Sequence, residues 1–182
     1  MRGELMKEKE ALLAQGEISL VLDTYDDIFS DFDPRAFDRR ALSDDFLNAA
    51  KKAALGKEGA LELGFLIPSS QRNMERETTI RQRLRALFRK HEEMLKEEIK
   101  QTKRKGIRMA FAGIVMILVA SYLLSLLSPA FWIHVLIVIL EPAGWFTAWT
   151  GMDEMYHTTR QKKPELDFYE KMAHATITFR TY

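Results

Sequence analysis

One carboxylate lies in the middle of the most apolar part of this sequence. Glu141 stands near the centre of the run from Ala130 to Thr150, which contains no other Asp, Glu, Lys or Arg, and Pro142 follows it directly. A charged side chain at the centre of a bilayer costs about 2.5 kcal/mol or more, so such residues usually face a bundle interior, a water-filled cavity or a partner. Pro142 also lacks an amide N–H, which frees the carbonyl of Val138 at the same depth. Glu141 and Pro142 are therefore the first candidates for an intramembrane site.

The helical period indicates what surrounds Glu141. The residues that share its face are His134, Gly144 and Ala148. Small residues let two helices approach closely, so this face is predicted to pack against another helix. In an antiparallel hairpin, Ile117 and Leu118 of the first span would be level with Glu141, and neither is polar. We therefore expect Glu141 to pair across an oligomer interface, unless it is protonated or lines an ion or proton pathway. His134, near the hairpin turn, is interpreted as an interfacial residue.

The residues around Glu141 resemble part of a known pore motif. In calcium uniporters an aspartate, two further residues and a Glu-Pro pair stand at the start of a pore helix, and the sequence LEPAGWF is similar at Glu141 and Pro142. This chain has Val138 in place of the aspartate, and Glu141 lies deep in its span rather than at a pore mouth. We therefore do not carry the family's function over. An oligomeric ion or proton conduit that uses Glu141 is kept as an alternative to a neutral glutamate bonded to a neighbouring helix.

A second group of carboxylates follows the first predicted strand. Its members are Asp23, Asp26, Asp27, Asp31, Asp33 and Asp38. The carboxyl end of a strand is a common place for a site, and Mg²⁺ or Ca²⁺ would favour several carboxylate oxygens there. A divalent cation, and a metal-dependent enzyme built on it, is thus one interpretation. The spacing lacks the glycine and terminal glutamate of an EF-hand, and Arg35, Arg39 and Arg40 follow closely. A charge-paired structural loop is the favoured interpretation.

Composition limits the other chemistry. The chain has 182 residues, a formal net charge of +1, four histidines and no cysteine. Disulfides and thiolate sites are excluded, and a net charge so near zero gives no general attraction for nucleic acid. No histidine has the sequence context of a catalytic triad, and neither a P-loop nor a dinucleotide-binding motif occurs. Apart from the aspartate loop, the sequence therefore favours a protein without a cofactor and leans away from an enzyme.

Two long apolar runs predict a membrane hairpin. Each of the runs, Met109 to Leu127 and Ala130 to Thr150, is long enough to cross a hydrocarbon layer of roughly 30 Å as a helix. Ser128 and Pro129 alone separate them, so the spans, about 107–128 and 130–150, form a tight turn with both ends on one side. The predicted partner is the lipid bilayer.

Basic residues flank the spans at the ends away from the turn. They lie in the segment Lys96 to Arg108 and at Arg160, Lys162 and Lys163, whereas the turn carries no charge. The positive-inside rule predicts a two-pass protein of the inner or plasma membrane with both termini in the cytoplasm. The residues predicted to contact lipid head groups are Lys103, Arg104, Lys105 and Arg108.

The remaining sequence predicts a small α/β module. A strand at Ile18–Leu22, a helix capped by Ser43 and a strand at Ala60–Ile67 make a parallel βαβ unit. Alternating residues from Ala175 to Tyr182 predict a further strand that returns to this sheet. The amino-terminal segment Met1–Gln15 has the pattern of a short amphipathic helix.

Two further helices connect the module with the hairpin. Ser69 or Ser70 is predicted to cap a long amphipathic helix from Gln71 to Lys105, which continues into the first span. Pro164 is predicted to begin the helix that follows the second span.

The predicted fold class is thus mixed, α+β with α/β character: a small βαβ-based sheet and a long amphipathic helix that leads into a transmembrane hairpin. The predicted parts are residues 1–105, 106–151 and 152–182. The favoured function is a membrane-anchored scaffold, sensor or effector module that forms homo-oligomers.

Overall fold

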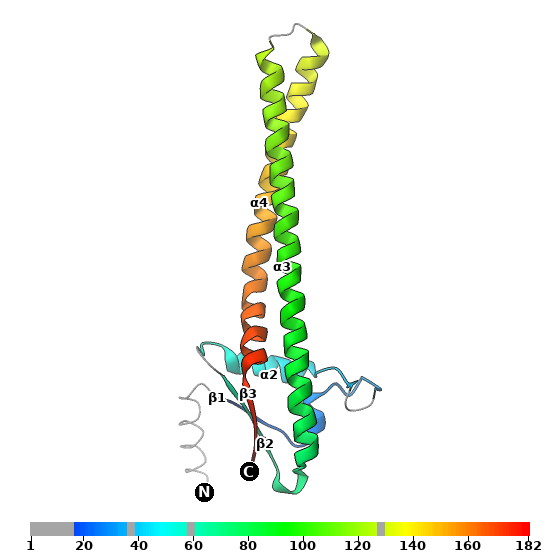
Figure 1. Cartoon of the computed structure of the whole chain (residues 1–182), viewed down its shortest axis with the longest axis vertical. Coiled ribbons are helices and arrows are strands. Elements are labelled where there is room, and N and C mark those ends of the chain that lie inside the picture. Colours follow the sequence, from blue (N-terminus) through cyan, green and yellow to red (C-terminus); the bar gives the residue numbers. More distant parts are fainter. Residues whose placement is uncertain (1–16, 36–38, 58–60, 127–129) are drawn as a thin grey trace. The chain divides into compact units, whose positions relative to one another are not determined.

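The computed structural model describes residues 17–35, 39–57, 61–126 and 130–182. The helices and strands along the chain are β1 (Glu17–Val21), η1 (Tyr25–Ile28), α2 (Asp44–Ala54), β2 (Glu62–Ile67), η3 (Ser69–Gln71), α3 (Met74–Ser125), α4 (Phe131–His174) and β3 (Thr176–Thr181) (Figure 1). They divide into two compact units. We call the unit formed by Met1–Glu92 and Asp167–Tyr182 the α/β module, and the unit Glu93–Leu166 the hairpin unit. Both long helices contribute residues to each unit.

The module contains a three-stranded parallel sheet with the order β1-β2-β3. Leu20 of β1 pairs with Phe65 of β2, which pairs with Phe179 of β3. The predicted βαβ unit is confirmed, and the returning strand does join the sheet. In sequence, the hairpin unit is therefore an insertion between two parts of one module.

Alternation along the strands creates the module core. Leu63, Phe65 and Ile67 of β2 are fully buried, as the pattern of apolar residues predicts. The ring centroids of Phe65 and Phe179 are 5.2 Å apart, so the aromatic side chains of neighbouring strands pack together. Phe88 of α3 also lies in this core, with its ring centroid 6.4 Å from that of Tyr169 of α4.

Two predicted helix starts are wrong. Ser69 and Ser70 belong to the 3-10 helix η3, and Asn73 caps α3 instead. Its Oδ1 atom accepts hydrogen bonds from the backbone N–H groups of Glu75 and Arg76, at 3.1 and 3.0 Å. Asparagine is as good a capping residue as serine, and here the turn after β2 decides between them.

Pro164 does not begin a helix, because it lies inside the continuous helix α4. A proline within a helix removes one hydrogen bond, and α4 continues through this loss. Ser43 is the residue before α2, with Asp44 and Asp45 in the first turn, but its side chain makes no capping hydrogen bond. Several predictions fall outside the described residues: the helix Met1–Gln15, the position of Asp38 and the Ser128–Pro129 turn.

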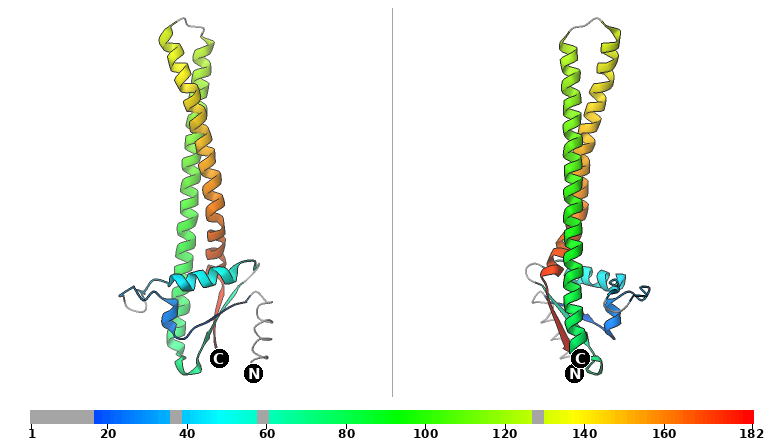
Figure 2. Two further views of the ribbon diagram at one scale, coloured as in Figure 1. Left: turned by 180° about the vertical axis from the view of Figure 1, so that it is seen from behind. Right: turned by 45° about the vertical axis from the view of Figure 1, so that its right-hand side comes forward.

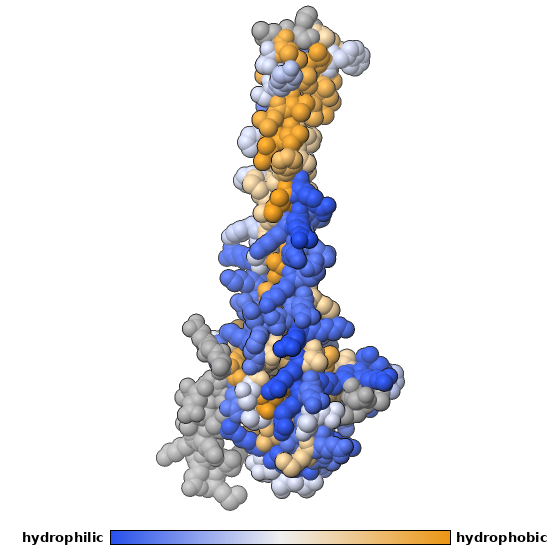
Figure 3. All heavy atoms as spheres, viewed as in Figure 1, coloured by the Kyte–Doolittle hydropathy of each residue, from blue (hydrophilic) through white to orange (hydrophobic). Residues whose placement is uncertain are grey.

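The hairpin unit has an apolar and a charged part. Each of α3 and α4 contains a stretch long and apolar enough to cross a membrane. Only 11% of that stretch in α3 and 17% in α4 are buried inside the protein. On the face that Figure 3 shows, apolar side chains cover the upper part of this unit and hydrophilic side chains cover its lower part. The helix α3 runs without a break into its apolar stretch, as predicted.

Candidate functional site

Small residues bring α3 and α4 into close contact within the hairpin unit. A Cβ atom added to Gly113 of α3 would lie 2.4 Å from the backbone nitrogen of Ala148 and 2.5 Å from the carbonyl oxygen of Gly144. Gly106 and Gly151 make a second contact of this kind, in which the same test places a Cβ of Gly106 2.6 Å from the carbonyl oxygen of Gly151. Backbone contacts of this kind leave no room for a larger residue.

These contacts show which helix packs against the predicted small-residue face of the second span. Gly144 and Ala148 are buried, and they face α3 of the same chain. The sequence predicted a packing face at these residues, and the hairpin itself supplies the helix that fills it. Gly144 lies against Ile117, which agrees with the predicted depth of the two spans relative to each other.

Glu141 lies one helical turn from Gly144, toward the hairpin turn, and its side chain is exposed. In this direction α3 and α4 diverge (Figure 2). Its neighbours on the surface of α4 are Val138 and Trp145, which are 70% and 59% exposed. Within residues 17–35, 39–57, 61–126 and 130–182, Glu141 has no hydrogen-bond or ion-pair partner. Glu141 is therefore a carboxylate on an otherwise apolar outer surface, where it is open to a group from another molecule.

The other predicted residues of the second span lie near Glu141 in sequence but differ in their surroundings. Pro142 is exposed and lies inside α4. His134 is also exposed, and its Nδ1 atom is 3.3 Å from the carbonyl oxygen of Ala130, one turn earlier. The structure therefore leaves Glu141, Pro142 and His134 on the surface and places Gly144 and Ala148 inside the hairpin.

The aspartate loop bonds mainly to itself and to its arginines. The carboxylate of Asp27 accepts hydrogen bonds from the backbone N–H groups of Asp23 and Thr24, at 2.8 and 3.0 Å. Asp33 accepts hydrogen bonds from Arg35 and from the amide of Ala41. These bonds, above all that from Arg35, hold the pKa of the Asp33 carboxyl well below its usual range.

In the same loop Asp26 forms an ion pair with Arg40, with a distance of 3.4 Å from Oδ1 to Nη1. Asp23 and Asp31 are exposed. Among the residues that the structure describes, no three His, Asp or Glu side chains come together as metal ligands would. The arrangement is that of the predicted charge-paired loop.

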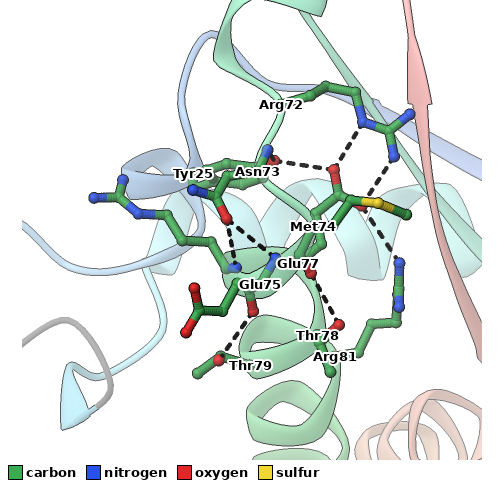
Figure 4. A network of polar contacts seen from close by, with 10 residues as sticks. Tyr25, Arg72, Asn73, Met74, Glu75, Glu77, Thr78, Thr79 and Arg81 are labelled. Carbon is green, nitrogen blue, oxygen red and sulfur yellow. Dashed lines mark hydrogen bonds and ion pairs between the residues drawn. The ribbon is translucent and has the colours of Figure 1, made fainter.

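The module contains a buried polar network that the sequence did not point to. Glu77, in the first turn of α3, is fully buried. Its carboxylate accepts hydrogen bonds from Tyr25 Oη at 3.0 Å and from Arg72 Nε and Nη2 at 2.8 and 2.9 Å (Figure 4). Arg81 is one turn further along α3, and its Nη2 atom lies 3.4 Å from Oε2 of Glu77. Tyr25 Oη in turn accepts a hydrogen bond of 2.9 Å from the backbone N–H of Asn73.

This network ties the carboxyl ends of two strands to α3. Tyr25 follows β1, and Arg72 and Asn73 follow β2. Burial alone would raise the pKa of Glu77, but the hydrogen bonds from Arg72 and Tyr25 and the charges of the arginines lower it overall. Burial, followed by the bond to Glu77, raises the pKa of Tyr25. A carboxylate with so many donors is charged and satisfied, so its role is to hold the loops at this edge.

Sequence reasoning missed Glu77 because it lies in a long run of mixed charges. A partial signal was present, because an acidic residue in the first turn of a helix is favoured by the helix dipole and Arg72 stands five residues earlier. The decisive partner, Tyr25, is 52 residues away in sequence. No local pattern predicts such a contact.

The predicted lipid-contacting residues lie on the charged part of α3. Lys103, Arg104, Lys105 and Arg108 are all exposed. Lys105 forms an ion pair of 2.9 Å with Glu154 of α4. Arg104, Lys105 and Arg108 line an open cavity of about 810 Å³, to which Glu154 also contributes. Arg104, Lys105 and Arg108 of the basic flank therefore share a cavity with the acidic residue Glu154.

Comparison with known proteins gives no family. The chain matches no protein-family model, and no curated protein or solved structure shows significant similarity to it.

Proposed function

We propose that this chain is an integral membrane protein that carries its α/β module on a two-pass helical hairpin. The observation that supports this most strongly is the exposure of the two apolar stretches, of which only 11% and 17% are buried in the protein. The apolar helix of a soluble core is mostly buried, because its side chains must leave water. Phe111 and Leu118, for example, are 67% and 63% exposed. A bilayer supplies the missing apolar cover.

The charged flanks support an orientation. Basic residues outnumber acidic ones before the first span and after the second, where Asp153 and Glu154 also stand, and the sequence between the spans has no charge. The positive-inside rule then places both ends of the hairpin, and with them the module, in the cytoplasm at an inner or plasma membrane. The protein would act there as a scaffold, sensor or effector.

Self-association is the second part of the proposal. An exposed carboxylate at mid-span is costly in lipid, and pairing it across an interface removes that cost. Gly144 and Ala148 are occupied within the hairpin, so the surface around Glu141 and Trp145 is proposed to meet a second copy.

Membrane insertion is tested by alkaline carbonate extraction of membranes that contain the full chain. An integral protein stays in the pellet, whereas release into the supernatant would overturn the proposal. Protease protection of tags at either terminus tests the orientation, because cytoplasmic tags are cleaved only when the protease reaches that side.

Self-association is tested by light scattering of the full chain in a mild detergent. We expect a defined oligomer for the parent and a smaller species for Glu141→Gln, because the amide cannot form the same charged or proton-sharing contact. His134→Gln is the matched control, since His134 is another exposed polar residue of the same span, and it should retain the oligomer. A monomeric parent, or an oligomer that Glu141→Gln leaves unchanged, would contradict this role of Glu141.

A conduit for ions or protons is the second candidate function, and the exposed position of Glu141 next to Pro142 favours it. In an oligomer, several such carboxylates would surround one axis. Proton flux into liposomes that contain the parent, lost in Glu141→Gln, would support this function. Absence of flux in the parent would remove it.

A further inference from the structure

A groove on the hairpin unit combines an apolar floor with a basic rim. Its volume is about 510 Å³, and α3 and α4 both contribute to it. The floor contains Ile107, Met152 and Met155, and the rim contains Lys103, Arg160 and Lys163. We call this feature the basic groove. No Asp or Glu is among the residues that line it.

We propose that the basic groove binds an anionic phospholipid, with the phosphate at the rim and the acyl chains on the apolar floor. The inference rests on the proposed membrane insertion. It differs from general attraction by a basic flank, because it assigns one site to residues of both helices, including Arg160 and Lys163 of α4.

Charge complementarity supports an anionic occupant. Three cations surround the groove, and within the described residues Lys103 and Lys163 form no ion pair. The neighbouring cavity lined by Arg104 and Lys105 is different, because Glu154 contributes to it and pairs with Lys105. The basic groove therefore has an uncompensated positive charge that the neighbouring cavity partly lacks.

The position of the groove fits a lipid rather than a soluble anion. Ile107 lies at the start of the first predicted span and Met152 just beyond the end of the second, and they are 57% and 46% exposed. Side chains on a helix lean toward its N-terminus, which for α4 is the direction of the span. The hydrogen bond of 3.3 Å from Arg160 Nη1 to Tyr156 Oη runs in this direction. Arg160 and Lys163 of α4 thus reach back toward the interface where phosphate groups of a bilayer lie, and Lys103 stands one turn before Ile107 on α3.

The test measures lipid binding to the full chain by native mass spectrometry in a mild detergent, with phosphatidylglycerol or phosphatidylcholine added. We expect the parent to prefer phosphatidylglycerol. The double variant Lys103→Gln with Arg160→Gln should bind phosphatidylglycerol about 10- to 30-fold more weakly, with phosphatidylcholine binding unchanged. The matched control, Arg104→Gln with Arg108→Gln, removes the same charge beside the groove and should change binding less than about threefold.

Three outcomes would overturn the proposal. They are no preference for phosphatidylglycerol in the parent, an equal loss in both double variants, and displacement of the lipid by glycerol 3-phosphate, which would identify a soluble ligand. Carbonate extraction of all three proteins separates this inference from the proposed function. A protein that is inserted but lacks lipid preference refutes only the basic groove, whereas release into the supernatant refutes membrane insertion itself.

Discussion

The two glutamates Glu77 and Glu141 show opposite ways of placing a carboxylate in apolar surroundings. Glu77 is fully buried in the module, and its oxygens accept hydrogen bonds from Tyr25 and Arg72. Glu141 is exposed on a helix whose neighbouring surface side chains, Val138 and Trp145, are apolar. The buried carboxylate is thus the one that finds its partners within the chain, whereas the exposed one has none among the described residues.

The two carboxylates differ because, within the described residues, only the module supplies hydrogen-bond donors to its own glutamate. Burial of an unpaired charge is far more costly than burial of one with several donors, and the module supplies those donors itself. The hairpin unit pairs small residues with small residues instead, and we propose that a bilayer and a second copy cover its outward surface. The module is thus predicted to be sensitive to loss of Glu77, whereas the fold of the hairpin unit should tolerate loss of Glu141.

The largest expected effect is that of Glu77→Gln. The substitution leaves Arg72 and Arg81, whose side chains are 30% and 35% exposed, beside a neutral group, so we expect the opening free energy of β2 to fall by about 2–4 kcal/mol. Hydrogen exchange of the amides in residues 62–67 of the full chain measures this quantity. Glu75→Gln, in the same turn but exposed, should change it by less than about 0.5 kcal/mol. Equal effects of the two substitutions would contradict the assigned role of the network.

Gly113→Val should have the next largest effect, and it should be confined to the hairpin unit. A Cβ at this position would lie 2.4 Å from the backbone of Ala148, so the helices must separate, at a cost of about 1–3 kcal/mol. Exchange protection of the α4 amides around Gly144–Gly151 reports the change. Ala112→Val makes a comparable substitution at the neighbouring exposed position, and it should leave this protection intact. If both variants behaved alike, the close contact would have no special importance.

Acid should weaken the parent more than the Glu77→Gln variant. The pKa of Glu77 in the folded chain lies below its ordinary value of 4.5, so the network stabilises the module fully above pH 4.5 and less as the pH falls through the folded pKa. In that window, we expect the free energy of unfolding of the parent to decrease by up to about 1.4 kcal/mol per pH unit more than that of the variant. Urea unfolding followed by circular dichroism at pH 3 to 6 measures both slopes. Parallel slopes would show that Glu77 titrates normally.

Glu141→Gln should have the smallest effect on folding. Glu141 has no partner among the described residues, so we expect the opening free energies of β2 and of the α4 contact region to change by less than about 0.5 kcal/mol. The same exchange experiment provides the measurement. A loss above about 1 kcal/mol in a monomeric preparation would mean that Glu141 stabilises its own chain, and the contrast with Glu77 would disappear.

Much of the fold was predictable because it follows from local periodicity. The alternation Leu63, Phe65, Ile67 predicted β2, and the pattern from Ala175 to Tyr182 predicted β3. Helix starts were less predictable, since Ser69, Ser70 and Asn73 are all suitable caps and the turn after β2 selects among them. Among the carboxylates in apolar surroundings, the sequence pointed to Glu141 but not to the network of Glu77.

The sequence by itself determined which segments are apolar, which are charged and what period each one follows, because these properties depend only on neighbouring residues. Only the tertiary structure decided which groups meet. It brought Tyr25 to Glu77 across 52 residues, and it used Gly144 and Ala148 within the hairpin, so that Glu141 stays on the surface. Such contacts depend on how strands and helices pack, and the sequence between two partners does not indicate that they will meet.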